Sequence, residues 1–176
     1  SRHRLENVAV MQLPRVEVAG SIQHRAAMSA DLVLGSQRLR VVNVHLDTRL
    51  NVTTRIEQLR PAAIDLPERA IVGGDFNTNP AAWIGNTVPV LLPVNGDSDQ
   101  APVLDDYMAA LGYHCPTASF GPTAPIPVLQ VRLDSIYLRG LAASGGRVER
   151  DVDVSDHWPV WTDVSLERSP EAVSAR

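Results

Sequence analysis

The feature that most constrains this chain is a short apolar run that ends in two glycines, a carboxylate and a carboxamide. It spans residues 70–78 and reads Ala-Ile-Val-Gly-Gly-Asp-Phe-Asn-Thr. An apolar run bounded by turn residues is typical of a strand buried on both faces, so Asp75 and Asn77 are expected where the strand leaves the core. Gly, Asp and Asn also form ordinary turns, and the segment alone fits a functional site or a simple Asx turn equally well.

Length and composition indicate one domain with an aliphatic core. The chain has 176 residues, of which 44% are hydrophobic and only 5% aromatic. We expect residues 1–168 to form a single domain and residues 169–176 to be a disordered tail. The single Cys115 has no partner for an internal disulfide and leaves the compartment open. No apolar run approaches the roughly 20 residues that span a bilayer, so we expect a soluble protein and take it as a monomer.

The charge balance indicates which kinds of molecule this chain is suited to bind. The formal net charge is −4, and all sixteen basic residues are arginine. This balance disfavours, without excluding, a protein that holds nucleic acid mainly through its phosphates.

Periodicity predicts an alternation of strands and helices. Gln23–Leu34 and Gln37–Leu46 flank Gly35-Ser36 and are expected to pair as a hairpin. A capping-box pattern at Thr54 predicts a helix toward Leu66, kinked or shortened by Pro61. The run at 70–72 follows, so strand, helix and strand predict one α/β crossover. The remaining expected elements are a strand and turn over 5–18, an irregular stretch over 79–100, a helix over 103–111, a loop over 113–127, and strands over 128–138, 147–154 and 159–166.

Three further polar motifs lie at expected strand ends. They are Val-Asn-Val-His-Leu-Asp at 42–47, Val-Arg-Leu-Asp-Ser-Ile at 131–136 and Ser-Asp-His-Trp-Pro-Val at 155–160. With Gly-Asp-Phe-Asn at 74–77, in this order and with these gaps, they resemble the endonuclease/exonuclease/phosphatase superfamily of metal-dependent phosphoesterases. The resemblance runs from about Gln37 to Leu166.

The resemblance implies a fold and a truncation. The family's fold is a four-layer α/β/β/α sandwich of two mixed sheets, as in pancreatic-type DNases. Its members carry an Asn strand and a metal-binding Glu strand upstream of the His motif, and nothing before His45 reproduces either. We therefore expect this chain to be the C-terminal larger part of such a domain.

The resemblance also implies roles for six residues. Asp75 would orient or deprotonate the attacking water, and Asn77 would hold the water, the phosphate or the metal. Asp134 would accept a hydrogen bond from His157 and fix its tautomer. The implied catalytic set is His45, Asp75, Asn77, Asp134 and His157; the implied ligands of Mg²⁺ or Mn²⁺ are Asp156, Asp75 and Asn77; and the implied phosphate contacts are His45 and His157.

Plainer interpretations remain for the same residues. His45 on a strand is more often structural or at the surface, and Asp134 can pair with Arg132 instead. Asp156-His157 fits a turn between strands. Asp47 and Asp105 are expected to be solvated or capping. Thr123 near Phe120 matches the family only suggestively.

The implied activity is metal-dependent hydrolysis of a phosphate ester, with water activated by Asp75. Net acidity favours a small or lipid-linked phosphoester over a DNA duplex. An endonuclease acting on DNA or RNA is the alternative from the same chemistry. A non-catalytic binding module that retains the fold is the alternative from another class.

Overall fold

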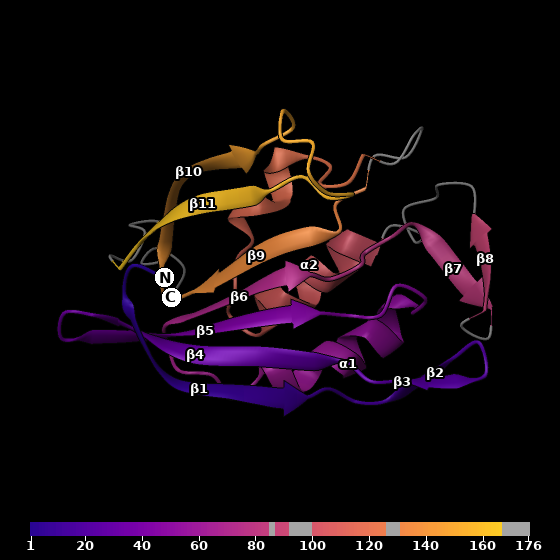
Figure 1. The fold of residues 1–176 in the computed structure, drawn as a ribbon, viewed down its shortest axis with the longest axis horizontal. Helices are drawn as coiled ribbons and strands as arrows, with labels where there is room; N and C mark the ends of the chain where they lie inside the picture. Colours follow the sequence, from indigo (N-terminus) through magenta and orange to yellow (C-terminus); the bar gives the residue numbers. More distant parts are fainter. Residues whose placement is uncertain (85–86, 92–99, 126–130, 167–176) are drawn as a thin grey trace.

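The computed structural model describes residues 1–84, 87–91, 100–125 and 131–166. Its centre is a five-stranded sheet in the order β1-β4-β5-β6-β9 (Figure 1). Strands β5 and β6 run parallel, and the other neighbouring pairs are antiparallel. The strand bounds are Arg4–Gln12 for β1, Ala26–Leu34 for β4, Gln37–His45 for β5, Ala70–Asp75 for β6 and Asp134–Arg139 for β9.

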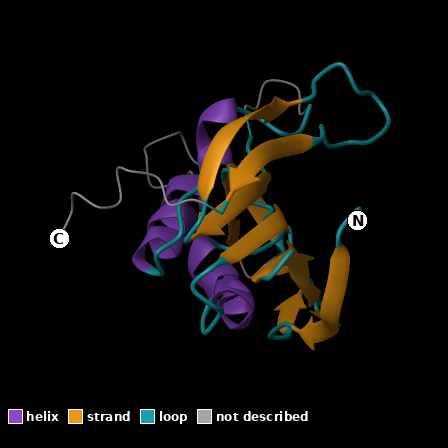
Figure 2. Cartoon of the chain, turned by 90° about the vertical axis from the view of Figure 1, so that its left-hand side faces the viewer, coloured by secondary structure: helices purple, strands orange, loops and turns teal. Residues whose placement is uncertain are grey.

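Two helices cover one face of this sheet, as Figure 2 shows. Helix α1 spans Val52–Ala63 and α2 spans Gln100–Ala110. Alternate residues of the strands point toward the helices, which puts Val42, Val44 and Val72 in the core. The core between helices and sheet contains Leu13, Ala27, Val42, Val44, Leu46, Leu59, Ala62, Ala63, Ala70, Val72, Phe76, Leu104, Met108, Tyr113 and Tyr137.

Three two-stranded sheets complete the described fold. The pairs are β2 (Val16–Val18) with β3 (Ser21–Gln23), β7 (Ala81–Ile84) with β8 (Val88–Leu91), and β10 (Ala142–Val148) with β11 (Val160–Ser165). A 3₁₀ helix, η1, spans Pro116–Phe120 and contacts both β9 and β10.

The architecture confirms the predicted α/β fold, with a central mixed sheet carrying helices. The resemblance implies a second mixed sheet; beside the central sheet the described residues form the two-stranded antiparallel pair β10–β11, so the sandwich of two mixed sheets stays a prediction. In the described part of the chain no helix covers the outer side of β10–β11, so the fourth layer stays a prediction.

The predicted hairpin and crossover are confirmed. Strands β4 and β5 pair antiparallel around Gly35-Ser36, and the chain returns through α1 to β6, which lies parallel to β5. The predicted start of α1 at Thr54 is wrong, because the helix begins at Val52 with Asn51 at its N-cap. Asn51 makes no side-chain cap bond; its amide instead exchanges hydrogen bonds of 2.8 and 3.0 Å with the backbone of Trp83.

Other element boundaries differ from those predicted from the sequence. The stretch predicted as irregular over 79–100 contains strands β7 and β8 and the first residue of α2, Gln100. The strand predicted over 147–154 lies earlier, as β10, and the strand predicted over 128–138 is described from Asp134. The predicted tail over 169–176 lies outside the described residues, as do residues 92–99 and 126–130. Neither described helix combines the length and the apolarity that crossing a bilayer requires.

Candidate active site

Three of the predicted residues form one row across neighbouring strands. His45 at the end of β5 is the register partner of Asp75 at the end of β6. Asp75 is in turn directly opposite Asp134, the first residue of β9. Register partners put their side chains on the same face of a sheet, so the three groups lie side by side on the face away from the helices. His45 Nε2 lies 3.5 Å from Asp75 Oδ2.

Gly74 lets β5 and β6 approach beside this row. Its φ is +137°, and a Cβ at this position would lie 2.1 Å from the carbonyl oxygen of Val44. Only glycine combines this backbone conformation with such a close approach. The glycine of the motif is therefore required for the register that places Asp75 next to His45.

Asp75 and Asn77 are joined in a tight turn after β6. The backbone N–H of Asn77 donates to Asp75 Oδ1 at 2.8 Å, and Asn77 Nδ2 donates to Asp75 Oδ2 at 3.0 Å and to the carbonyl of Leu46 at 2.8 Å. Asn77 has a φ of +52°, a left-handed conformation that asparagine tolerates better than most residues. Both amide hydrogens are used, which leaves Asn77 Oδ1 as the acceptor facing any ligand.

Asp134 is the centre of a hydrogen-bond network that converges on its Oδ2. Thr123 Oγ1 donates to Asp134 Oδ2 at 2.8 Å and accepts the backbone N–H groups of Leu133 and Asp134, both at 3.0 Å. His157 Nδ1 lies 2.7 Å from the same Oδ2. Because an ionised carboxylate only accepts, Nδ1 carries the proton and Nε2 is left to face the pocket.

Neighbouring charges and burial shift the pKa values of Asp75, in this row, and of His157, which is hydrogen-bonded to the row. Burial raises the pKa of Asp75, and the charge of Asp134 adds to the effect, although the backbone N–H of Asn77 and the two histidines oppose it. For His157, burial favours the neutral ring. The hydrogen bond and charge of Asp134, helped by Asp75 and Asp156, outweigh burial and raise the pKa of His157 above its usual value.

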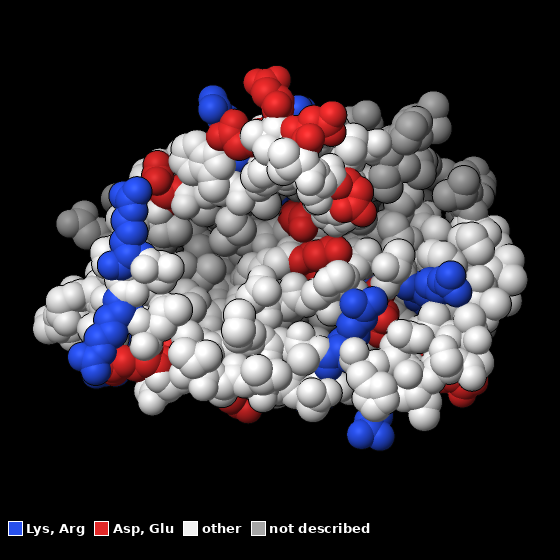
Figure 3. All heavy atoms as spheres, in the orientation of Figure 1, with Lys and Arg blue, Asp and Glu red and all other residues white. Residues whose placement is uncertain are grey.

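All six predicted residues line one pocket of about 520 Å³. Asp156, exposed on the loop before β11, closes one side of it. Figure 3 shows acidic side chains gathered in a hollow at the middle of this face. The full lining is His45, Thr48, Asp75, Asn77, Ala124, Leu133, Asp134, Asp156 and His157.

The donor set of this pocket fits a hard divalent cation. Asp75, Asp134 and His157 each offer a ligand atom, all within 4.8 Å of one another. The cluster shares only Asp75 with the predicted metal ligands, but Asp156 and Asn77 face the same pocket. Three carboxylates around one cavity repel one another, and oxygen ligands of this kind suit Mg²⁺ or Mn²⁺.

A buried arginine that sequence reasoning missed holds the loops of the site. Arg55 on α1 is 0% exposed. Its Nη1 donates to the carbonyls of Asp47 at 2.6 Å and Phe76 at 2.8 Å, and its Nη2 donates to the carbonyl of Leu50 at 2.8 Å. Nε donates to the side chain of Gln100 at 2.9 Å. The guanidinium thus joins the loop after β5 to the loop after β6.

Two aspartates expected to be solvated or capping have other partners. Asp47 is buried, 3% exposed, and accepts hydrogen bonds from Arg25 and Gln58, both at 2.8 Å. Asp105 accepts from Arg132 Nη2 at 2.6 Å. Arg132 therefore pairs with Asp105 and leaves Asp134 to His157.

Comparison with known proteins agrees with the fold and the motifs. The sequence profile of the Endonuclease/Exonuclease/phosphatase family matches residues 38–157. A search of curated protein sequences found no match.

Among solved structures, the chain resembles the endonuclease domain of TRAS1, a telomere-specific non-LTR retrotransposon, at a TM-score of 0.58 and 16% identity, covering 92% of this chain and 80% of that one. A family protein from Bacteroides thetaiotaomicron gives a TM-score of 0.63 at 13% identity, covering 94% and 66% of the two chains. A mannosyl-6-phosphatase from Bacteroides thetaiotaomicron VPI-5482 gives 0.57 at 14% identity, covering 92% and 67%. With the profile match over most of its length, the chain belongs to the endonuclease/exonuclease/phosphatase family.

Proposed function

We propose that this protein hydrolyses phosphate esters with the help of a divalent metal ion, through the pocket that Asp75, Asp134 and His157 share. The observation that carries the proposal is the row of side chains across β5, β6 and β9, with His157 hydrogen-bonded to its last member. A structural turn has no need of two carboxylates and two histidines around one cavity. Family membership supports the same reaction class.

The residues of the row have complementary chemistry. Asp75 has a raised pKa, which makes it a better proton acceptor for an attacking water than an ordinary carboxylate. Asn77 Oδ1 would orient that water. His157, protonated and held by Asp134, donates from Nε2 to a phosphate oxygen and stabilises the charge that develops there. His45 supplies a second contact to the phosphate.

Mg²⁺ or Mn²⁺ would be held by the carboxylates of Asp75 and Asp156 with Asn77 Oδ1. When bound, such an ion neutralises phosphate charge and polarises the scissile ester. Asp75 would also set the position of the ion relative to His157, because Asp75 is the register partner of Asp134, which holds His157.

Hydrolysis of bis-p-nitrophenyl phosphate and p-nitrophenyl phosphate tests the proposal, with Mg²⁺ or Mn²⁺ and with EDTA. We expect metal-dependent release of p-nitrophenol that falls about 10²- to 10⁴-fold in Asp75→Asn, since this range is typical of losing a general base. The matched control is Asp163→Asn, which removes an exposed carboxylate on β11 that does not line the pocket.

Retained activity in Asp75→Asn would remove Asp75 from the mechanism. Circular dichroism of both variants establishes that the fold is intact. No hydrolysis of either ester at any metal concentration, with a folded wild-type chain, would favour the binding module over the enzyme.

A further inference from the structure

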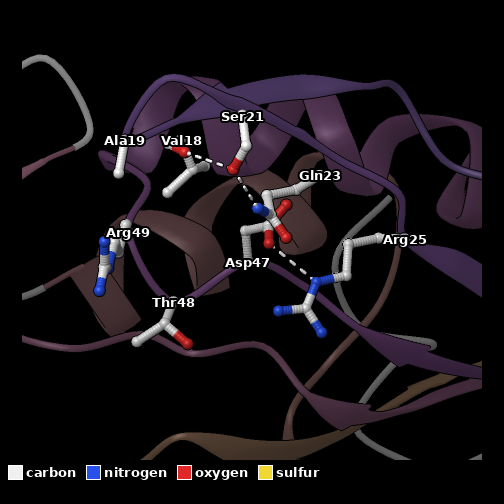
Figure 4. Close-up of a pocket in the computed structure, with 8 residues that line it drawn as sticks. All are labelled: Val18, Ala19, Ser21, Gln23, Arg25, Asp47, Thr48 and Arg49. Atoms are coloured by element: carbon white, nitrogen blue, oxygen red, sulfur yellow. Dashed lines mark hydrogen bonds and ion pairs between the residues drawn. The ribbon is translucent and has the colours of Figure 1, made fainter.

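A second pocket adjoins the candidate active site. It has a volume of about 280 Å³ and lies between the β2–β3 hairpin and the loop after β5. Thr48 lines both pockets, so the two lie side by side. Figure 4 shows Arg25 and Arg49 on opposite sides of Thr48 and Asp47. The lining residues are Val18, Ala19, Ser21, Gln23, Arg25, Asp47, Thr48 and Arg49.

Arg25 is held in place by one of its five N–H groups. Its Nε donates to Asp47 Oδ1 at 2.8 Å, while Asp47 Oδ2 accepts from Gln58 at 2.8 Å. The carboxylate is 3% exposed and engaged through both oxygens. The side chain of Arg25 is 28% exposed, and its two terminal nitrogens have no hydrogen-bond acceptor among the described residues. The ion pair therefore orients Arg25 and leaves its outer edge free.

Arg49 is oriented by an aromatic ring. Its guanidinium carbon lies 5.9 Å from the ring centroid of Trp83. Trp83 is itself fixed, because its backbone exchanges two hydrogen bonds with Asn51 and its Nε1 donates to Asn79 at 3.2 Å. Asn79 in turn donates to the carbonyl of Thr48 at 2.8 Å. A guanidinium that lies near a ring face through cation–π attraction spends none of its N–H groups on that contact, so they stay available for hydrogen bonds.

The two pockets differ in charge. The candidate active site presents three carboxylates and no arginine, whereas the adjoining pocket presents two arginines and one carboxylate that is already paired. Figure 3 shows basic side chains on the same face as the central acidic group. A ligand that spans both pockets would bind a reacting phosphate in the first and another anion in the second.

We propose that the pocket between Arg25 and Arg49 binds a second phosphate group of the substrate. The inference rests on the proposed hydrolysis and narrows its substrate to esters that carry two phosphates. Arginine donates two parallel hydrogen bonds to phosphate, and the hydroxyl of Thr48 supplies another donor between the pockets. A second phosphate of this kind is present in a nucleotide strand and in a small bisphosphorylated ester.

Calorimetric titration with paired ligands tests the site without relying on turnover. The first pair is thymidine 5′-monophosphate and thymidine 3′,5′-bisphosphate, at constant Mg²⁺ and with released phosphate measured in parallel. The second pair is fructose 6-phosphate and fructose 1,6-bisphosphate. We expect the wild-type chain to bind the bisphosphate of at least one pair about tenfold more tightly, which is about 1.4 kcal/mol.

Arg49→Gln and Arg25→Gln should each reduce that preference to about twofold or less. Glutamine at position 25 still donates to Asp47, which protects the fold. The control is Arg2→Gln, an exposed arginine before β1 that does not line the pocket, and it should keep the full preference.

Preference in the nucleotide pair alone identifies a nucleotide strand as the source of the second phosphate, and preference in the sugar pair alone identifies a small ester. Equal affinity for the two ligands within both pairs would overturn the proposal of a second phosphate site. A full preference for the bisphosphate in both arginine variants would also overturn it. Because p-nitrophenyl esters carry one phosphate, their hydrolysis by the same chain tests the proposed reaction separately.

Discussion

Arg55→Lys removes the fork that joins the loops of the active site while keeping the positive charge. The guanidinium makes five hydrogen bonds, to Gln100 Oε1 and to the carbonyls of Asp47, Phe76, Thr48 and Leu50, at 2.6 to 3.3 Å. A lysine ammonium has three donors on a single nitrogen, so it cannot reproduce the five planar N–H groups with which the guanidinium reaches carbonyls of both loops. At least two buried acceptors then lose their partner.

The expected change in the free energy of unfolding follows from the burial of Arg55 and from its hydrogen bonds. Burial lowers the pKa of Arg55 from its ordinary value to about 10, against the favourable charges of Asp75 and Asp47. A shift of this size corresponds to roughly 3 kcal/mol of unfavourable free energy for burying the charge, which the hydrogen bonds must offset. Each acceptor left without a donor costs about 1–3 kcal/mol. We therefore expect Arg55→Lys to lower the free energy of unfolding by about 3–5 kcal/mol.

Urea unfolding followed by tryptophan fluorescence measures this change. The matched control is Arg60→Lys, an exposed position on the same helix, which should stay within about 0.5 kcal/mol of wild type. A loss below about 1 kcal/mol in Arg55→Lys would refute the assignment of Arg55 as the group that holds both loops. Wild-type hydrolysis by the folded variant would refute its connection to the catalytic site.

Further predictions concern the residues that hold this row in place. The pKa of His157, followed by NMR titration, should lie above 6.5 and fall in Asp134→Asn; an unchanged value would contradict the pairing. Since folding raises this pKa, the stability it contributes is complete below about pH 6.5 and is lost as the pH rises through the folded-state pKa. Gly74→Ala should lower the free energy of unfolding by about 2–4 kcal/mol, because its Cβ would meet the carbonyl of Val44; unfolding at wild-type urea concentrations would argue against this. Thr123→Val should cost about 1–3 kcal/mol and slow hydrolysis, since two backbone N–H groups and a carboxylate lose their partner; unaltered kinetics would exclude a role in positioning Asp134.

Local sequence patterns were sufficient for the elements that carry the row. The alternation in 37–46 predicts His45 on the face opposite Val44, and the apolar run at 70–72 predicts Asp75 at a strand end. Both are found. A hairpin and a crossover then follow from chain order. These patterns are short and depend on few distant contacts.

Elements that depend on distant contacts were not predicted. Asn51 replaces Thr54 at the start of α1 because its side chain bonds to Trp83, which lies 32 positions away. Strand β8 contains Pro89, and β10 contains Gly145 and Gly146 within an irregular register, so both look like turns in the sequence.

The same limit applies to the site. All six candidate residues line one pocket, as local motifs indicated, but their catalytic roles stay predictions. Arg55 looks like a solvated helix residue, and only the tertiary fold brings Gln100 to it, 45 positions along the chain. Thr123 gave a faint signal through its family resemblance. Arg25 and Arg49 gave none, because their orientation depends on Asp47 and Trp83.

Because the row of His45, Asp75 and Asp134 is fixed by the sheet, substrate recognition can change during evolution while the reacting groups keep their positions. Its three members stand on adjacent strands, so main-chain pairing sets their spacing, and most side-chain replacements elsewhere leave that spacing intact. A one-residue insertion inside β6 would turn Asp75 to the helical face and abolish the arrangement at once. The hairpins β2–β3 and β7–β8 lie outside this sheet, so a change in their length or charge leaves the register of β5, β6 and β9 unchanged. Descendants of such a chain can therefore acquire new substrates through their hairpins while the reacting groups stay in place.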